Sequence, residues 1–266
     1  KKIGVLLCLC VIFIVYGATY AIVHAAYQLN TYVGLLVYVL IAYFTISVKS
    51  LGEAAQTIRM SLEAGNVDDA RSQLSQIVGR DTEKLNREEI VRATVETVAE
   101  NTSDGIIAPL FYLLLGGVPL AMTYKAVNTL DSMVGYKNEK YIHLGWASAR
   151  CDDLANYLPA RITGFLLFLS ALLQGRDWKN SWATIKRDAR KHASPNSGYP
   201  EAAVAGALNV RLGGTNFYNG IPRTSPLIGM QEKMLNECSI GAVVRLMYSS
   251  SLIMVAVSLL ILWRMP

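Results

Sequence analysis

The feature that most constrains this chain is an apolar run over residues 3–23, which follows two lysines at the N-terminus. A second apolar run covers residues 33–48, after a short connector. Each run approaches the roughly 20 residues that a helix needs to cross a bilayer. Two lysines before an apolar run also have the outline of a signal peptide. The run is long for a signal and a second run follows at once, so we favour a membrane hairpin.

Three further segments are candidates for contact with the membrane. Residues 242–263 form a third strong apolar run, and Arg245 near its start can extend its charged end to the interface. Residues 106–124 and 158–173 are weaker candidates. The sequence Gly116-Gly117-Val118-Pro119 interrupts the first of these, which predicts a broken helix. We favour a segment that dips into the membrane and returns over one that crosses it.

The distribution of charge predicts an orientation. Residues 25–30 contain no Lys or Arg, whereas residues 49–92 contain seven and residues 176–191 contain six. Basic connectors stay in the cytoplasm, so we expect these two segments and the N-terminus on that side of the cell membrane. The same loops account for the net charge of +5, and no basic and aromatic pattern suggests nucleic acid. Charged residues make up only 17% of the chain, against about 25% in soluble proteins, which excludes an ordinary soluble enzyme.

The remaining pattern is helical. Apolar residues follow the helical period over 51–62 and again over 67–77, which predicts an amphipathic hairpin within residues 50–79. A third amphipathic helix is expected over residues 88–103. Residues 194–225 have the composition of a loop, interrupted by a short helix over 201–210. We therefore expect an all-α, polytopic membrane protein with re-entrant or broken helices and a cytoplasmic-side loop region, formed as one catalytic domain over residues 1–266.

An acidic stripe marks the third predicted helix. Four-residue spacing places its members on one face: Glu88, Arg92, Glu96, Glu100 and Asp104. The first half fits a solvated face with ion pairs between neighbouring turns. The second half has no cation, and like charges at this spacing destabilise a helix by roughly 0.2–0.5 kcal/mol per pair. Bound Mg²⁺, with Asn101 adding an oxygen, would explain Glu96, Glu100 and Asp104. Spacing alone leaves the solvated face and the metal site equally open.

A second polar group follows along the chain. Asn128 and Asp131 share a helix face, and Asp152 faces Asn156 four residues later. Asp153 and Arg161 lie on a further stripe, where a structural link between the two side chains competes with a functional role. The four cysteines form no CxxC pair and the three histidines are scattered, so neither a disulfide framework nor a zinc site is expected.

A third polar group leads into the helix predicted at residue 201. Pro200 suits the first turn of a helix, whose free N–H groups attract phosphate or carboxylate. Ser194, Asn196 and Ser197 could add donors, and we expect Arg211 with Gly213-Gly214 to close the helix. Lys191 precedes the group, and His192 is either a general base or a surface or capping residue. Alone, this is a weak pattern.

Several blocks in fixed order resemble one known family. Residues 94–105 (TVETVAENTSDG), 126–136 (AVNTLDSMVGY), 145–153 (GWASARCDD) and 194–203 (SPNSGYPEAA) resemble the adenosylcobinamide-phosphate synthase family of cobalamin biosynthesis. Shorter blocks at residues 108–112, 156–161 and 206–214 continue the resemblance, which covers about residues 88–214. The family usually begins with a segment carrying Gly-Asp-Pro and His-Pro-Val. This chain lacks that segment and begins with Lys, so we expect that an upstream part is missing.

The resemblance implies a multi-pass membrane enzyme that faces the cytoplasm. It would join a carboxylate of adenosylcobyric acid to the amine of aminopropanol phosphate, with ATP and Mg²⁺, through an acyl phosphate. Together with the residue patterns it implies catalytic Glu96, Glu100, Asp104, Asp131 and Asp152, of which the first three are the metal ligands. The expected substrate and phosphate contacts are Asn101, Asn128, Arg150, Asp153, Arg161, Lys191, Ser194, Asn196 and Arg211.

Other classes of function stay open at this point. Carboxylates within a membrane also mark transport pathways, so a membrane transporter is one alternative. A non-catalytic membrane sensor with the same fold is another, although the expected carboxylates are all present. Besides membrane lipid and the substrates, other membrane-bound enzymes of corrinoid assembly are candidate partners.

Overall fold

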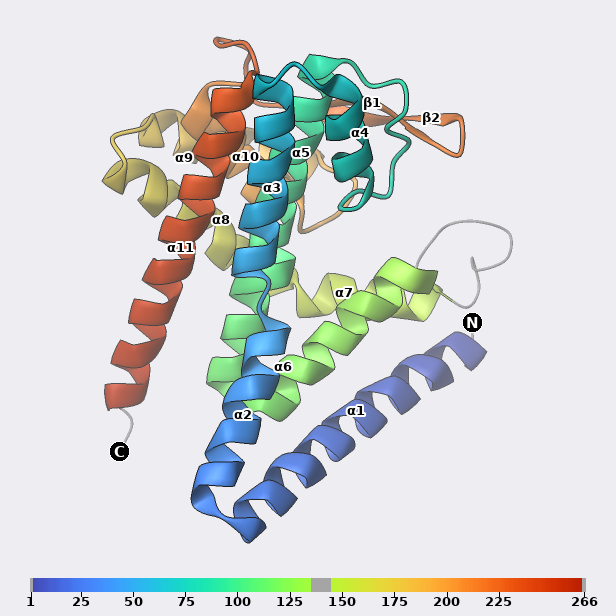
Figure 1. Ribbon diagram of the computed structural model, residues 1–266, viewed down its shortest axis with the longest axis vertical. Helices are drawn as coiled ribbons and strands as arrows, with labels where there is room; N and C mark the ends of the chain where they lie inside the picture. Colours follow the sequence, from blue (N-terminus) through green and yellow to red (C-terminus); the bar gives the residue numbers. More distant parts are fainter. Residues whose placement is uncertain (1, 135–144, 265–266) are drawn as a thin grey trace. The chain divides into compact units, whose positions relative to one another are not determined.

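The computed structural model describes residues 2–134 and 145–264. The described chain is mostly helical, as the sequence predicts. It divides into two compact units, which are described separately (Figure 1). Unit 1 comprises Lys1–Ser47 and Asp104–Pro159, and unit 2 comprises Val48–Ser103 and Ala160–Pro266. The expectation of one domain over residues 1–266 stays a prediction.

Unit 1 is built from long apolar helices. Helix α1 (Lys2–Leu29) packs against α2 (Thr31–Thr45), α6 (Ala108–Val134) and α7 (Trp146–Ala155). The turn between α1 and α2 is tight because the Asn30 side chain caps α2, accepting a hydrogen bond from the Tyr32 N–H at 2.8 Å. A π-helical turn, η1 (Ser103–Ile107), leads into α6.

Helix α6 is broken where the sequence predicts. Gly116 and Gly117 leave helical geometry, with φ of −149° and +66°. A positive φ is strained for any residue with a Cβ, so Gly117 permits the break. Pro119, just beyond it, cannot donate a backbone hydrogen bond to the preceding turn. The break is confirmed, whereas the choice between a dip and a full crossing stays a prediction.

Unit 2 holds the predicted amphipathic hairpin and most of the polar residues. Helices α3 (Val48–Glu63) and α4 (Val67–Ser75) form the hairpin, and Ile58, Leu62 and Leu74 are fully buried there. Helix α5 (Arg87–Thr102) begins with a capping box between Asn86 and Glu89. The other helices are α8 (Tyr157–Leu173), which starts in unit 1, α9 (Trp178–Asp188), the 3₁₀ turn η2 (Ala189–Lys191), α10 (Gly198–Leu208) and α11 (Glu237–Arg264).

The segment expected to be a loop contains a β-hairpin instead. Strands β1 (Leu212–Tyr218) and β2 (Ile221–Ile228) pair antiparallel, with Leu212 opposite Ile228. Asn219 and Gly220 form the turn with φ of 51° and 75°. An Asn-Gly pair is the strongest local signal for such a turn, and it outweighs the loop-like composition around it.

The end of α10 also differs from the expectation. The helix runs from Gly198 to Leu208 and ends at Asn209, which takes the left-handed conformation with φ of 57°. Asn tolerates this conformation better than most residues, so it serves as the cap. Arg211 and Gly213-Gly214 therefore do not close the helix; the two glycines belong to β1.

Within residues 2–134 and 145–264, four helical segments are long and apolar enough to cross a membrane, and a fifth candidate is the bent pair of α7 and α8, which meet at 46°. The four segments are Lys2–Leu29, Thr31–Glu63, Arg87–Val134 and Glu237–Arg264. Large apolar side chains on them face outward, among them Phe13, Phe44 and Leu262. These features support a membrane protein. The cytoplasmic orientation stays a prediction.

Candidate functional site

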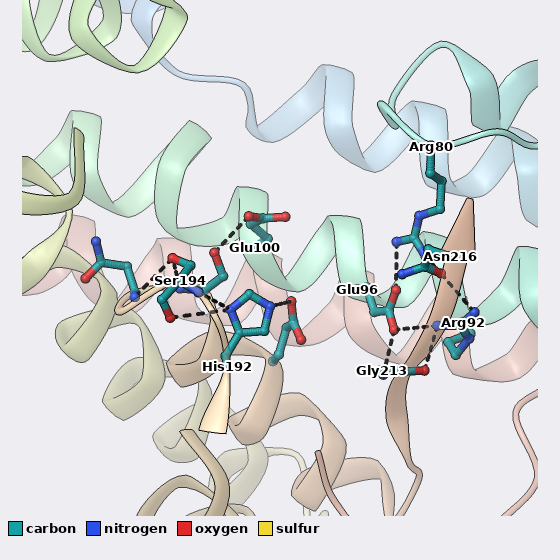
Figure 2. A network of polar contacts seen from close by, with 11 residues as sticks. Arg80, Arg92, Glu96, Glu100, His192, Ser194, Gly213 and Asn216 are labelled. Carbon is teal, nitrogen blue, oxygen red and sulfur yellow. Dashed lines mark hydrogen bonds and ion pairs between the residues drawn. The ribbon is translucent and has the colours of Figure 1, made fainter. Parts of the chain in front are cut away.

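A buried carboxylate, that of Glu96, lies in the middle of α5 in unit 2 (Figure 2). Its Oε2 lies 2.7 Å from a guanidinium nitrogen of Arg80, and its Oε1 lies 3.2 Å from one of Arg92. The Gly213 N–H donates to Oε1 at 2.8 Å. The side chains of Glu96 and Arg80 are only 8% and 10% exposed. Burial of these charges is tolerable because each carboxylate oxygen accepts charged or backbone donors.

The two arginines connect Glu96 to β1. Arg80 and Arg92 both donate to the side-chain oxygen of Asn216, at 2.7 and 3.1 Å. Arg92 also donates to the Gly213 carbonyl at 2.6 Å. We call Arg80, Arg92, Glu96, Gly213 and Asn216 the Glu96 node. The node joins α5, the segment before it and β1 into one rigid polar cluster, visible at the right of Figure 2.

A second polar cluster of unit 2 lies at the start of α10, around His192 (Figure 2). The Ser194 N–H donates to His192 Nδ1 at 3.0 Å, so the neutral ring carries its proton on Nε2. That Nε2 lies 3.8 Å from a carboxylate oxygen of Glu201. The Ser197 hydroxyl donates to Glu100 at 2.8 Å. The loop therefore places a histidine and two acids around the first turn of α10.

Glu201 has an unusual environment. Burial raises the pKa of its carboxyl well above the ordinary value of 4.5, and the negative charges of Glu96 and Glu100 raise it further. The positive charges of Arg80 and Arg92 act in the opposite direction but are weaker causes. A neutral carboxylic acid beside a histidine can give or take a proton.

Sequence reasoning missed Glu201 as a site residue. The one signal available was an acid within the otherwise apolar segment GYPEAAVAGAL, which becomes the fully buried helix α10.

In the predicted phosphate-binding loop at the start of α10, some N–H donors are bonded to other groups of the same loop. The Ser194 hydroxyl oxygen accepts from the N–H groups of Asn196 and Ser197, both at 3.2 Å. Arg161 donates to the Asn196 side-chain oxygen at 3.2 Å, and its guanidinium lies 4.3 Å from the centre of the Tyr199 ring. The structure thus brings together Arg161, Ser194 and Asn196, as expected of one site. Two of the N–H groups expected to hold a phosphate are engaged within the loop.

Unit 1 contains a separate polar cluster centred on Asp152. Asn128 and Asn156 each donate to one of its carboxylate oxygens, both at 3.1 Å. The Tyr124 hydroxyl donates to the Asn156 side-chain oxygen at 2.7 Å and so fixes the direction of that amide. The expected pairing of Asp152 with Asn156 is confirmed.

Asp131 belongs to the same cluster, within electrostatic reach of Asp152. One of its carboxylate oxygens, Oδ1, is buried and has no hydrogen-bond partner among the described residues. We call Asn128, Asp131, Asp152 and Asn156 the Asp152 cluster. A buried polar atom without a partner is rare in proteins and calls for an explanation such as a bound ion or water.

The remaining predicted residues make other contacts. Arg150 and Asp153 form an ion pair at 3.9 Å on α7, and Asn101 donates to the Thr97 carbonyl of its own helix at 3.0 Å. Lys191 pairs with Asp188 at 2.7 Å. Asp104 lies in η1 of unit 1, whereas Glu96 and Glu100 belong to unit 2. The proposed link between Asp153 and Arg161 would join the two units and stays untested.

No group of three or more acids, histidines or cysteines is arranged to hold a metal ion within residues 2–134 and 145–264. In the Glu96 node both carboxylate oxygens are engaged by arginines or a backbone N–H. The magnesium ligand set Glu96, Glu100 and Asp104 therefore stays a prediction without support from the geometry of Glu96.

Comparison with known proteins places this arrangement in a family. The sequence model of the family described as CobD/Cbib protein matches residues 1–247. The cobalamin biosynthesis protein CobD of Geobacter metallireducens is 50% identical over 252 residues, which cover 95% of this chain and 79% of the relative. Those of Clostridium perfringens and Klebsiella pneumoniae are 51% and 48% identical, with 88% and 93% of this chain and 75% and 78% of the relative covered.

No solved structure matches this chain. The family match includes every sequence block on which the resemblance rested, together with α5, the Asp152 cluster and the start of α10. The chain therefore belongs to the CobD/CbiB family of cobalamin biosynthesis proteins.

Proposed function

We propose that the protein is an ATP-dependent ligase that forms an amide between adenosylcobyric acid and aminopropanol phosphate, giving adenosylcobinamide phosphate. The observation that carries the proposal is the family match over residues 1–247, which spans both polar regions. The polar residues of each unit suit substrates with several negative charges, because they include arginines, a lysine and oriented amides.

The proposed reaction has two steps. A carboxylate oxygen of adenosylcobyric acid attacks the terminal phosphorus of ATP, which forms an acyl phosphate and releases ADP. The amine of aminopropanol phosphate then attacks the acyl carbon, the amide forms, and phosphate leaves with the bonding electron pair. The attacking nitrogen also loses a proton to a base. Both steps depend mainly on positioned charge that stabilises developing negative charge, so no protein nucleophile is required.

The His192–Glu201 pair is a group of unit 2 that can exchange a proton. The protonated Nε2 of His192 faces Glu201, and burial favours the neutral form of that acid. Because the pKa of Glu201 is raised, its ionised form is a stronger base than an ordinary carboxylate and can take up a proton during the reaction. Ser194 holds the other ring nitrogen at 3.0 Å, which keeps the imidazole in one orientation. We therefore assign the pair an acid–base role.

The Asp152 cluster is the part of the structure that best fits Mg²⁺. This ion takes oxygen ligands, usually one or two carboxylates completed by water and substrate phosphates. Asp131 offers a buried oxygen without a partner, and Asp152 is held in place by two amides. When bound, the ion would neutralise charge on the phosphates of ATP. We therefore propose Asp131 and Asp152 as metal ligands, in addition to the predicted set Glu96, Glu100 and Asp104.

The direct test is to incubate the purified full chain with adenosylcobyric acid, aminopropanol phosphate and Mg-ATP, and to identify products by mass spectrometry. The proposal expects one amide product and one ADP per turnover. Omission of the amine should leave only slow release of ADP. A transporter or a sensor predicts no amide product under any of these conditions, and that result would overturn the proposal.

A further inference from the structure

Two adjoining cavities in unit 2 lie outside the clusters described so far. The first, of about 470 Å³, is lined by Arg187, Asp188, Lys191 and Arg211 among others. The second, of about 400 Å³, lies beside the start of α5 and is lined by Glu88 and Glu89 among others. Both cavities share Arg211, Leu227 and Gln231, so together they form one groove. We call it the Arg211 groove.

The first cavity is positively charged. Asp188 accepts from Arg187 and Lys191, each at 2.7 Å, and from the Gly229 N–H at 2.9 Å. The hydrogen bonds from Arg187 are the main reason that the pKa of Asp188 lies well below its usual range. The ionised carboxylate therefore fixes two cations on the cavity wall. With Arg211 the wall carries three positive charges against one negative charge.

Arg211 is the group with spare binding capacity. Within residues 2–134 and 145–264 its guanidinium has no ion pair and no hydrogen bond, although it lines both cavities. Arginine binds phosphate with paired, charge-assisted hydrogen bonds. The exposed end of the groove at Arg211 is therefore built for a phosphate group.

The second cavity carries charges of both signs. Glu88 and Glu89 line it, and Glu89 is already engaged with the Asn86 N–H at 2.8 Å. Glu88 is exposed and pairs with no cation in the part of the chain that the structure describes. Arg92 and Lys233 also line this cavity, but the charge of Arg92 is balanced by Glu96.

One of two adjacent glycines, Gly214, leaves open space at the wall of this cavity. Gly213 and Gly214 have φ of 88° and 103°. A Cβ on Gly214 would meet only a nitrogen of Arg92, at 3.9 Å, so the backbone is accessible to a ligand there. The groove thus offers cations at one end and, at the other, an unpaired acid beside open backbone.

We propose that the Arg211 groove binds a small zwitterion, a phosphate monoester that carries a primary ammonium group. Arg211, Arg187 and Lys191 would hold the phosphate, and Glu88 the ammonium. The assignment rests on the proposed function in that the amino-alcohol phosphate is then the substrate bound there. ATP is not the occupant, because a triphosphate would place additional negative charge beside Glu88 and Glu89.

The test separates the two ends of the ligand. Calorimetry on the full chain in detergent measures the affinity of aminopropanol phosphate, of propyl phosphate, which lacks the amine, and of aminopropanol, which lacks the phosphate. Arg211→Ala should weaken binding of both phosphate esters by roughly 10- to 100-fold, as expected for a lost charge-assisted hydrogen bond, and leave that of aminopropanol unchanged. Glu88→Gln should weaken the binding of aminopropanol phosphate and of aminopropanol, which carry the amine, and leave the binding of propyl phosphate unchanged.

Arg223→Ala is the matched control, because Arg223 is an exposed arginine on β2 of the hairpin that follows Arg211, with its guanidinium 5.3 Å from the centre of the Tyr218 ring. It should bind all three ligands as the wild type does. Thermal unfolding of each variant checks the fold, and Arg211→Lys should recover part of the affinity. Equal binding by wild type and Arg211→Ala would overturn the proposal. So would a selective loss of ATP binding.

Phosphatidylethanolamine has a headgroup of the same chemistry, so a second arm uses nanodiscs with and without this lipid. Competition by the lipid, with no binding of soluble aminopropanol phosphate, would overturn the assignment to a substrate. The experiment needs no turnover. Binding without any amide product in the ligation assay would refute the proposed function alone, whereas an amide product with unaltered binding by Arg211→Ala would refute the groove alone.

Discussion

The Glu96 node and the Asp152 cluster use carboxylates in opposite ways. In the node, two arginines and a backbone N–H engage both oxygens of Glu96. In the cluster, the amides of Asn128 and Asn156 donate to Asp152, and Asp131 keeps a buried oxygen without a partner among the described residues. An acid that is neutralised by neighbouring arginines, such as Glu96, supports the fold. An acid that keeps an oxygen without a partner, such as Asp131, can bind a ligand. The comparison predicts different responses to mutation.

The largest effect is expected in the node. Glu96→Ala would leave the guanidinium groups of Arg80 and Arg92 buried without a carboxylate. Removal of one partner from a buried ion pair costs about 3–5 kcal/mol of stability. Denaturant or thermal unfolding in detergent measures the loss. Glu53→Ala is the control, since its pair with Lys49 is 66% and 76% exposed and should contribute less than about 1 kcal/mol. Equal stability of both variants would mean that the node is not part of the framework.

The opposite result is expected for Asp131→Asn. The substitution keeps the shape of the side chain and removes a charge whose Oδ1 has no partner among the described residues, so the stability should be unchanged or higher. Loss of a magnesium ligand should nevertheless lower ligation at limiting Mg²⁺ by about 10- to 100-fold, by analogy with other changes around metal sites. The rate is measured over a range of Mg²⁺ concentrations, with the exposed Asp68→Asn as control. If the variant showed the wild-type dependence on Mg²⁺ together with lower stability, Asp131 would support the fold and would not be a metal ligand.

Glu201 adds a third case to the comparison, because its charge is removed by a bound proton and not by a neighbouring cation. The raised pKa means that the folded state keeps a proton that the unfolded state loses above pH 4.5. The contribution of Glu201 to stability should therefore be greatest near or below pH 4.5 and should fall as the pH rises toward the folded-state pKa, by up to about 1.4 kcal/mol per pH unit.

Glu201→Gln should remove this fall, because glutamine stays neutral at every pH. Unfolding temperatures recorded between pH 5 and 8 provide the measurement. Glu232→Gln, a change at an exposed acid, should retain the wild-type profile. Identical pH profiles for wild type and Glu201→Gln would show that the carboxyl is ionised in the folded protein.

The smallest effect concerns the orientation of an amide in the Asp152 cluster. Tyr124→Phe removes the hydroxyl that donates to Asn156 at 2.7 Å. Loss of one buried hydrogen bond should cost about 0.5–1.5 kcal/mol in stability. Tyr112→Phe is a useful comparison, because the Tyr112 hydroxyl donates to the Ala155 carbonyl and not to the cluster. Only Tyr124→Phe should also raise the Mg²⁺ concentration needed for half-maximal ligation; the same shift in both variants would argue against a positioning role for Tyr124.

Local patterns in the sequence predict much of this fold. Long apolar runs, helical periodicity and caps identify α1, α2, α3, α4, α5 and α11, and Gly116-Gly117 identifies the break in α6. The β-hairpin was missed because composition was given more weight than the Asn219-Gly220 turn signal. Local patterns succeed where neighbouring residues determine the backbone.

The site was harder to predict because its contacts are distant in sequence. Spacing on α5 pairs Glu96 with Arg92 correctly, but Asn216 lies 136 residues from Arg80, and no local pattern joins them. Glu201 became important only when α10 was buried beside other acids. The helix faces of Asn128 and Asp152 were predictable, whereas the unpartnered oxygen of Asp131 was visible only in three dimensions.

The Glu96 node also has a consequence for the order of folding. Gly213 follows Glu96 by 117 residues, so during synthesis α5 leaves the ribosome long before the strand that completes the node. A contact at such separation must close a long loop and therefore forms late. The ion pair with Arg92 lies within one helix and can form at once. Arg92 can therefore balance the charge of Glu96 within the newly made helix before the strand that carries Gly213 has been synthesised.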